Sequence, residues 1–325
     1  MAARTSSGQR LDSHHHLWTA SRVERGDYHW MPDEGPLRND HLPEHLAPEL
    51  ERAGVGGTIV IQAAQAVEET RFLLDLARNA DFVLGVSGWA PLDRPEATET
   101  LADLAENDYL RAIRPMIHDI PDRYWISRPQ VRENLRSLAG LGLRFEALTY
   151  TEHLPPVYDA LEEIPELPAV INHLSKPAYR WEDDEEWRRW MSRLAERPNT
   201  YCKLSGMLTE VGPGWTEAHF EPYVNFLFET FGAGRVIFGS DWPVSRQLLE
   251  YPDVVALTER LVSPLTPREA EAFWRTSAEA FYGVRVAACS ADAGEPSQES
   301  RGGAGVKRSS EEQQRMGQEI RKGTV

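Results

Sequence analysis

The sequence predicts an α/β fold, a (β/α)8 TIM barrel, and three observations support it. Short apolar segments alternate with helix-length segments along residues 10–286, the pattern of a mostly parallel sheet covered by helices. The short segments number eight, the strand count of such a barrel. The span of about 280 residues also suits this fold, which typically takes about 250. A doubly wound open sheet would alternate in the same way, so the strand count favours the barrel.

Each expected strand is short, rich in apolar residues and separated from the next by a segment of helical length. The strands are expected at residues 10–16, 57–64, 82–90, 110–118, 143–150, 169–174, 200–206 and 236–241. The helices are expected at residues 42–53, 67–79, 95–106, 129–141, 154–164, 183–196, 217–231, 248–262 and 267–282. Gly54 and Gly232 follow helix ends and Pro129 sits near a helix start, which supports these bounds.

The two ends of the chain are predicted to lie outside the barrel, which takes residues 10–286. The last stretch, residues 287–325, contains no Leu, Phe, Tyr or Trp and is rich in Ser, Gly, Glu, Gln and Arg. It cannot bury enough apolar surface to offset the entropy lost on ordering, so we expect a disordered tail. Residues 1–9 are likewise expected to be a disordered N-terminus.

Charge and composition exclude several classes of protein. The net charge of −16 argues against a nucleic-acid partner, which needs a basic patch. No run approaches the roughly 18 apolar residues that a membrane span needs, and the N-terminus lacks a signal-peptide stretch. Cys202 and Cys289, the two cysteines, are too few for a disulfide framework or a cysteine-rich zinc module. We expect a cytoplasmic protein with a small-molecule substrate and no membrane partner; a homo-oligomer stays open.

Polar side chains gather where the predicted strands end, which is where barrel enzymes carry their catalytic groups. His14 and His16 lie two apart on the first strand and so face the same side, a two-pronged clamp that suits zinc. His173 follows the sixth strand and Asp241 the eighth. Alone, His173 would more often be a core histidine and Asp241 a helix N-cap. Their joint placement around one mouth favours a site.

Other charged residues at strand ends are expected to bind substrate. Arg114 and His118 belong to the fourth strand, Glu146 to the fifth and Lys203 to the seventh. The guanidinium of Arg114 suits a substrate carboxylate, hydroxyls or an oxyanion. The alternative for Arg114 is a structural ion pair inside the barrel with Glu146.

Aromatic residues are expected to wall the site. Residues 18–41 form an unusually long loop after the first strand and contain Tyr28, whose ring could stack on a sugar or an aromatic acid. Trp89 and Trp242 are further candidates. The alternative is that these rings simply pack over the barrel top.

Several runs of the sequence resemble the amidohydrolase superfamily, and more narrowly its sugar-lactonase-like branch of metal-dependent hydrolases. They are LDSHHHLW, INHLSKP, CKLSGM and FGSDWP, together with LRAIRPMIH, PDRYW and the closing FYGV, and they span residues 10–284. The resemblance implies a metallo-dependent hydrolase barrel with His14, His16, His173 and Asp241 around the reaction centre. It also implies one divalent metal, with zinc expected, although some members of the branch hydrolyse lactones without a metal.

The sequence departs from the superfamily pattern in three places. Many members carry a carboxylated lysine on the fourth strand and a histidine on the fifth, which this chain lacks, so a two-metal centre is not expected. Asn172 and Ser175 give NHLSKP where DHLGKP is common, and Ser277 stands where an Asn is usual. These changes could alter substrate choice or fine geometry.

These residues together predict a hydrolase that opens a sugar lactone or a carboxylated lactone. Asp241 is expected to act as general base on water, with His173 as its catalytic partner and a divalent ion as the activating group. One alternative is a metal-dependent decarboxylase of an aromatic or unsaturated acid in the same superfamily. A second is a non-catalytic barrel that binds a ligand, against which the retention of the complete His/Asp set argues.

Overall fold

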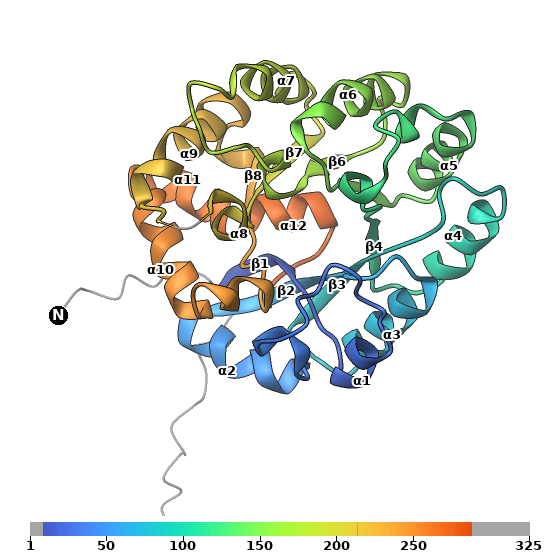
Figure 1. Ribbon diagram of the computed structural model, residues 1–325, viewed down its shortest axis with the longest axis horizontal. Coiled ribbons are helices and arrows are strands. Elements are labelled where there is room, and N and C mark those ends of the chain that lie inside the picture. Colours follow the sequence, from blue (N-terminus) through green and yellow to red (C-terminus); the bar gives the residue numbers. More distant parts are fainter. Residues whose placement is uncertain (1–8, 213, 288–325) are drawn as a thin grey trace, which may run out of the picture. The chain divides into compact units, whose positions relative to one another are not determined.

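The computed structural model describes residues 9–212 and 214–287, and its eight strands form one parallel sheet in sequence order, which confirms the predicted TIM barrel (Figure 1). The expected disordered ends fall outside the described residues, apart from Gln9 and Ala287. No helix in the described ranges is long and apolar enough to cross a membrane. The strands are β1 (Arg10–His15), β2 (Val55–Ile61), β3 (Val83–Gly88), β4 (Leu110–Ile113), β5 (Arg144–Ala147), β6 (Ala169–Ile171), β7 (Thr200–Leu204) and β8 (Val236–Phe238).

The barrel closes at the carboxyl ends of its first and last strands. His15 and Trp242 form an isolated parallel bridge. On either side of it, the amide of Asp241 donates to the His14 carbonyl at 2.8 Å, and the amide of His16 donates to the Trp242 carbonyl at 2.7 Å. The closing hydrogen bonds therefore lie among the residues that the sequence predicts to be functional.

A ring of helices surrounds the sheet, as Figure 1 shows. Helix α9 has the predicted bounds, whereas the expected helix 267–282 is divided by a π-helical turn at Ala272–Thr276. The short helices α1 and α8 were not expected. The helices are α1 (Ala20–Glu24), α2 (Pro43–Ala53), α3 (Val67–Ala77), α4 (Ala97–Ala105), α5 (Pro129–Gly140), α6 (Leu154–Glu163), α7 (Glu185–Ala195), α8 (Met207–Val211), α9 (Glu217–Phe231), α10 (Tyr251–Leu261), α11 (Pro267–Glu271) and α12 (Ser277–Tyr282).

The strands end earlier than predicted, because the chain leaves the ladder just before the functional residues. After β6, His173 has a φ of 50°, and after β8, Asp241 has a φ of 58°. A left-handed residue cannot continue a strand, so β6 and β8 each stop three residues before the expected bounds. After β4, the predicted strand end at residues 117–118 lies in a 3-10 turn, Ile117–Asp119.

The core has two main layers. One lies between the barrel and its helices, and the other fills the barrel interior, where inward residues of the strands such as Leu11, Ile61 and Ile237 meet Phe281 and Tyr282 of α12. Helix α12 thus packs against the inside of the barrel rather than around it (Figure 1). This leaves the carboxyl ends of the strands as the open mouth.

The long segment after β1 packs over one side of that mouth. Trp18 donates from Nε1 to the Leu37 carbonyl at 2.8 Å, and Trp30 donates from Nε1 to the Ala63 carbonyl at 2.8 Å. These rings form a small apolar cluster with Tyr28. The segment is therefore anchored to the loop after β2.

Candidate active site

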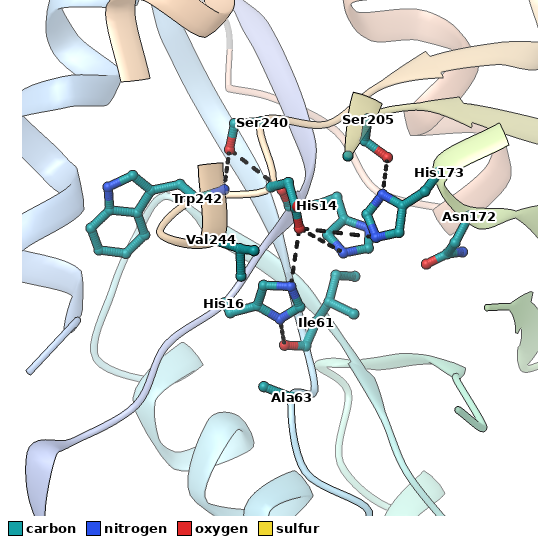
Figure 2. A network of polar contacts seen from close by, with 12 residues as sticks. His14, His16, Ile61, Ala63, Asn172, His173, Ser205, Ser240, Trp242 and Val244 are labelled. Atoms are coloured by element: carbon teal, nitrogen blue, oxygen red, sulfur yellow. Dashed lines mark hydrogen bonds and ion pairs between the residues drawn. The ribbon is translucent and has the colours of Figure 1, made fainter. Parts of the chain in front are cut away.

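The structure brings together the four residues predicted to surround the reaction centre. The Nε2 atoms of His14, His16 and His173 lie 3.7, 3.4 and 3.9 Å from one oxygen, Oδ1 of Asp241. Figure 2 shows the three rings converging, two of them from β1 and its end and the third from the turn after β6. All four side chains are buried or nearly so. The third histidine of the run, His15, faces away and contacts the Thr58 hydroxyl at 2.9 Å.

The turn that carries His173 is built from left-handed residues. His173, Leu174, Ser175 and Lys176 have φ values of 50°, 56°, 57° and 46°. This conformation costs a non-glycine residue about 1–2 kcal/mol, so it persists only where neighbours hold it. Trp187 donates from Nε1 to the Leu174 carbonyl at 2.6 Å, and the Ser175 hydroxyl contacts that of Thr149 at 2.8 Å. Ser175 therefore replaces the usual glycine at a position where glycine would be unstrained.

A glycine makes room for the His173 ring. A Cβ at Gly206 would lie 2.3 Å from Nδ1 of His173, closer than any side chain allows. The ring can therefore pack over the backbone of residue 206, with its Nδ1 2.9 Å from the Ser205 hydroxyl. Ser205 and Gly206, which directly follow β7, thus fix the position of a histidine that follows β6.

The site keeps its carboxylate charged and its imidazoles neutral. Burial lowers the pKa of His14 and of His16, and it lowers that of His173 to about 3. Burial alone would raise the pKa of Asp241, but the facing His173 and His16 outweigh it and hold the pKa below the usual value. Near neutral pH, Asp241 is therefore an ionised base among uncharged rings.

The donor set fits a divalent metal ion. The ligand atoms of His14, His173 and Asp241 all lie within 4.8 Å of one another, and Nε2 of His14 is buried without a hydrogen-bond partner. Tetrahedral zinc, with bonds of about 2.0–2.1 Å, holds its ligand atoms about 3.3 Å apart, close to the 3.4–3.9 Å seen around Asp241. Imidazole and carboxylate are ligands that zinc accepts.

A cleft opens above these residues, at the carboxyl ends of the strands. Arg114 and His118 line it, as predicted from the sequence. The full lining is His16, Trp30, Pro32, Ala63, Arg114, Met116, His118, Leu148, His173, Lys176, Thr209, Glu210, Asp241, Val244 and Gln247.

Two residues expected to bind substrate lie beneath the cleft instead. Lys203 and Glu146 are fully buried and absent from its lining, and Nζ of Lys203 donates to Oε2 of Glu146 at 2.6 Å. Tyr282 of α12 donates to the other oxygen of Glu146 at 2.7 Å, and Asn172 donates to Oε2 at 3.0 Å. Both side chains point into the barrel from within short strands. The sequence alone does not tell how far below the cleft such a side chain lies.

The alternative for Arg114, an ion pair with Glu146, is not formed among the described residues. Its guanidinium instead donates to the Gln62 carbonyl, while Nε of the same group has no partner. The charge of Glu146 still acts on it at longer range, and burial lowers the pKa of Arg114. Arg114 thus lines the cleft while its guanidinium is held by the Gln62 carbonyl.

The aromatic residue that lines the cleft is not one of the three predicted from the sequence. Tyr28, Trp89 and Trp242 do not line the cleft, and Trp30 does. Tyr28 packs against Trp18 and Trp30 with ring centroids 5.5 and 6.5 Å apart, and Trp242 packs edge-on to His41 at 5.2 Å. Tyr28 and Trp242 therefore pack against neighbouring rings and not along the cleft.

Sequence reasoning missed a charged pair on the cleft wall. Lys176 Nζ lies 2.8 Å from Oε1 of Glu210, and it also lies over the Tyr150 ring at 5.4 Å from the centroid. Lys176 follows β6 by a few residues and Glu210 belongs to α8, which follows β7. Only their location after strand ends could have indicated these two residues, because neither belongs to a recognisable metal-binding or acid–base pattern.

Comparison with known proteins places the chain among hydrolases. A family model described as amidohydrolase matches residues 11–284. An L-fucono-1,5-lactonase of Burkholderia ambifaria is 41% identical over 239 residues, which cover 73% of this chain and 81% of that protein. An L-fucono-1,5-lactonase of Burkholderia multivorans is 31% identical, with 85% and 96% covered. A crystal structure of a Burkholderia multivorans amidohydrolase with bound zinc superposes with a TM-score of 0.80 at 31% identity, covering 85% of this chain and all of that one.

Proposed function

The chain belongs to the amidohydrolase family, and on that premise we propose that it is a lactonase that opens a neutral sugar lactone with water. The observation that carries the proposal is the ionised Asp241, ringed by three neutral histidines at the floor of a cleft. The two fuconolactonases among its relatives support an aldonolactone as the substrate class.

Asp241 is the proposed general base. A water molecule beside its carboxylate gives up a proton to Asp241 as the water oxygen attacks the lactone carbonyl. A bound divalent ion, held by the histidines and Asp241, would lower the pKa of that water and polarise the carbonyl. The attack forms a C–O bond and places a negative charge on the former carbonyl oxygen.

Arg114 is the proposed stabiliser of that charge. Arg114 lies at the wall of the cleft, and its guanidinium forms no ion pair within the described residues, so its charge is available to the oxyanion. When the tetrahedral intermediate collapses, the bond to the ring oxygen breaks and Asp241 returns its proton to the leaving alkoxide. The balanced outcome is one hydroxy acid from one lactone and one water.

The charges on the cleft wall favour a neutral substrate over a carboxylated one. Among the described residues that line the cleft, two cations, Lys176 and Arg114, stand beside two carboxylates, Glu210 and Asp241, and Lys176 is paired with Glu210. The cleft therefore has no excess of positive charge to offer a substrate carboxylate. Hydroxyl groups, in contrast, can bond to Lys176, Glu210 and Gln247 as they stand.

A pH-indicator assay tests the proposal with purified protein, neutral aldono-1,4- and 1,5-lactones, and a 2-pyrone dicarboxylate. We expect acid release from at least one neutral lactone, with kcat/KM at least about tenfold above that for the dicarboxylate, since lost ion pairing costs about 1.4 kcal/mol or more. Runs with and without chelator report whether a metal is needed. Silence on every lactone would refute the proposal, and CO2 release from an aromatic acid would favour the decarboxylase alternative.

A further inference from the structure

The end of β2 and the loop after it (residues 61–64, the β2 loop) hold three side chains of the cleft through three consecutive carbonyls. Nδ1 of His16 lies 2.9 Å from the first carbonyl oxygen, the guanidinium of Arg114 donates to the second, and Nε1 of Trp30 donates to the third at 2.8 Å. All three side chains line the cleft, although they follow two different strands, β1 and β4. Their relative positions therefore depend on where this one loop lies.

The amides of the β2 loop are held by one buried carboxylate. Oε2 of Glu69, in the first turn of α3, accepts from the amide of Ala63 at 2.9 Å and from the amide of Ala64 at 2.6 Å. All three residues are buried, so solvent does not offer these amides another acceptor. A buried amide left without a partner costs about 1–3 kcal/mol. The loop therefore keeps its place only while an oxygen of residue 69 is within reach of both amides.

We propose that Glu69 is a positioning residue of the site, which fixes the β2 loop and through it the places of the three cleft side chains. Glu69 is absent from the lining of the cleft, so it acts through the loop and not on the substrate. Groups that serve a reaction must be held within about 0.5 Å of their productive places by such supporting hydrogen bonds. The effect of Glu69 on catalysis rests on the function proposed above, whereas its effect on the loop does not.

The contacts of Glu69 predict that the length of its side chain matters more than its charge. Both amides bond to the same oxygen, so one oxygen at that reach is enough. Glu69→Gln keeps such an oxygen and should hold the loop. Glu69→Asp keeps the charge but withdraws the carboxylate by one methylene, so the loop must either move toward α3 or give up a hydrogen bond.

The test follows Trp30 by ¹⁹F NMR in protein labelled with 5-fluorotryptophan, together with kcat/KM for a neutral aldono-1,5-lactone. A Trp30→Phe variant identifies the Trp30 signal by difference. In Glu69→Asp we expect that signal to move and kcat/KM to fall about 10²-fold, as for a displacement of about 1 Å in the site. In Glu69→Gln we expect the signal and the activity of the unchanged chain to be restored.

Glu68→Asp is the matched control, because it makes the same substitution at the exposed neighbouring residue of α3. It should leave the Trp30 signal and kcat/KM unchanged. The proposal is overturned if Glu69→Asp behaves like Glu68→Asp in both readouts, even with a lower melting temperature, since Glu69 would then only stabilise the fold. It is also overturned if Glu69→Gln is as impaired as Glu69→Asp.

Hydrogen exchange of the unchanged chain adds a measurement that needs no variant to fold. The peptide that contains Ala63 and Ala64 should exchange slowly, because both amides are buried and bonded to a carboxylate. Fast exchange there would overturn the proposal. If the unchanged chain opens no lactone, the proposed function fails, and the ¹⁹F and exchange results still decide whether Glu69 fixes the loop.

Discussion

Two groups of buried polar side chains meet inside the barrel, and they differ in how completely they are hydrogen-bonded. In the lower group, Lys203, Glu146 and Tyr282, both carboxylate oxygens, the phenol and every ammonium proton have a partner. In the upper group, which faces the cleft, Nε2 of His14 has none and the carboxylate of Asp241 is ringed only by histidines at 3.4–3.9 Å. Buried polar groups that have hydrogen-bond partners stabilise the fold. Buried polar groups without partners beside a cleft are, in contrast, available to bind a ligand.

The largest effect expected from this comparison is on activity, from a change in the upper group. Asp241→Asn keeps the shape of the side chain but removes the base, so kcat should fall about 10²- to 10⁴-fold. The melting temperature should stay close to that of the unchanged protein, because no hydrogen bond from a backbone group to this carboxylate is lost. Asp122→Asn, an exposed carboxylate bound to Arg128, is the control and should keep full activity. A similar drop in both variants would contradict the assignment.

A substitution in the lower group should instead lower the stability of the fold. Glu146→Ala leaves Lys203 as an uncompensated buried charge, which should cost about 3–5 kcal/mol of unfolding free energy. Replacing both partners, as Lys203→Met/Glu146→Leu, should recover most of that loss. Urea unfolding of the two variants measures the difference. If the single variant were as stable as the double one, the buried ion pair would not be the stabilising unit described above.

Two glycine-to-alanine substitutions separate the effect of steric crowding at the site from the effect of backbone strain. Gly206→Ala places a methyl group 2.3 Å from the His173 ring and must move it, so we expect about a 10²-fold loss of kcat/KM, as for a displacement of about 1 Å. Gly54 has nearly the same φ, 65° against 63°, with nothing within 4 Å of an added Cβ. Gly54→Ala should therefore cost about 1 kcal/mol of stability and no activity. Equal activity in the two variants would show that the ring does not need this space.

The smallest effect is on the pH dependence of stability. Burial lowers the pKa of His118 to about 2, against an ordinary 6.5, so the unfolded chain takes up a proton at a pH where the native state does not. The stability that His118 contributes is therefore present above pH 6.5 and is lost as pH falls. His118→Gln should flatten the decline below pH 6.5 by at most about 1.4 kcal/mol per pH unit, with no change between pH 7 and 9. Denaturant midpoints across pH 4–9 measure it, and parallel curves would contradict it.

The fold was predictable from the sequence because it rests on local patterns. Alternating apolar segments and the strand-end positions of His14, His16, His173 and Asp241 were enough to place four residues from three strands in one site. Depth was not predictable, because a strand's pattern tells which side a residue faces and not how far along the barrel axis it lies. Lys203 and Glu146 were therefore expected in the cleft, although they lie beneath it.

The cleft wall escaped prediction for a different reason. Lys176 and Glu210 meet only because the left-handed turn after β6 and the short helix α8 after β7 fold toward each other. A run of left-handed residues without glycine contradicts local preference, and only tertiary contacts such as the Trp187 hydrogen bond to Leu174 sustain it. No local sequence pattern predicts such a turn.

The closing bonds of the barrel have a consequence for synthesis of the chain. The amide of Ser240 bonds to Asp12 across 228 residues, and Asp241 joins His14 in the same turn. At about 5–20 residues per second, a ribosome needs roughly 10–50 s between making the two sides of this joint. Throughout that time β1 has no β8 to pair with, and the chain lacks Asp241, the proposed base. The closed sheet and the proposed site are therefore completed together, when β8 joins β1.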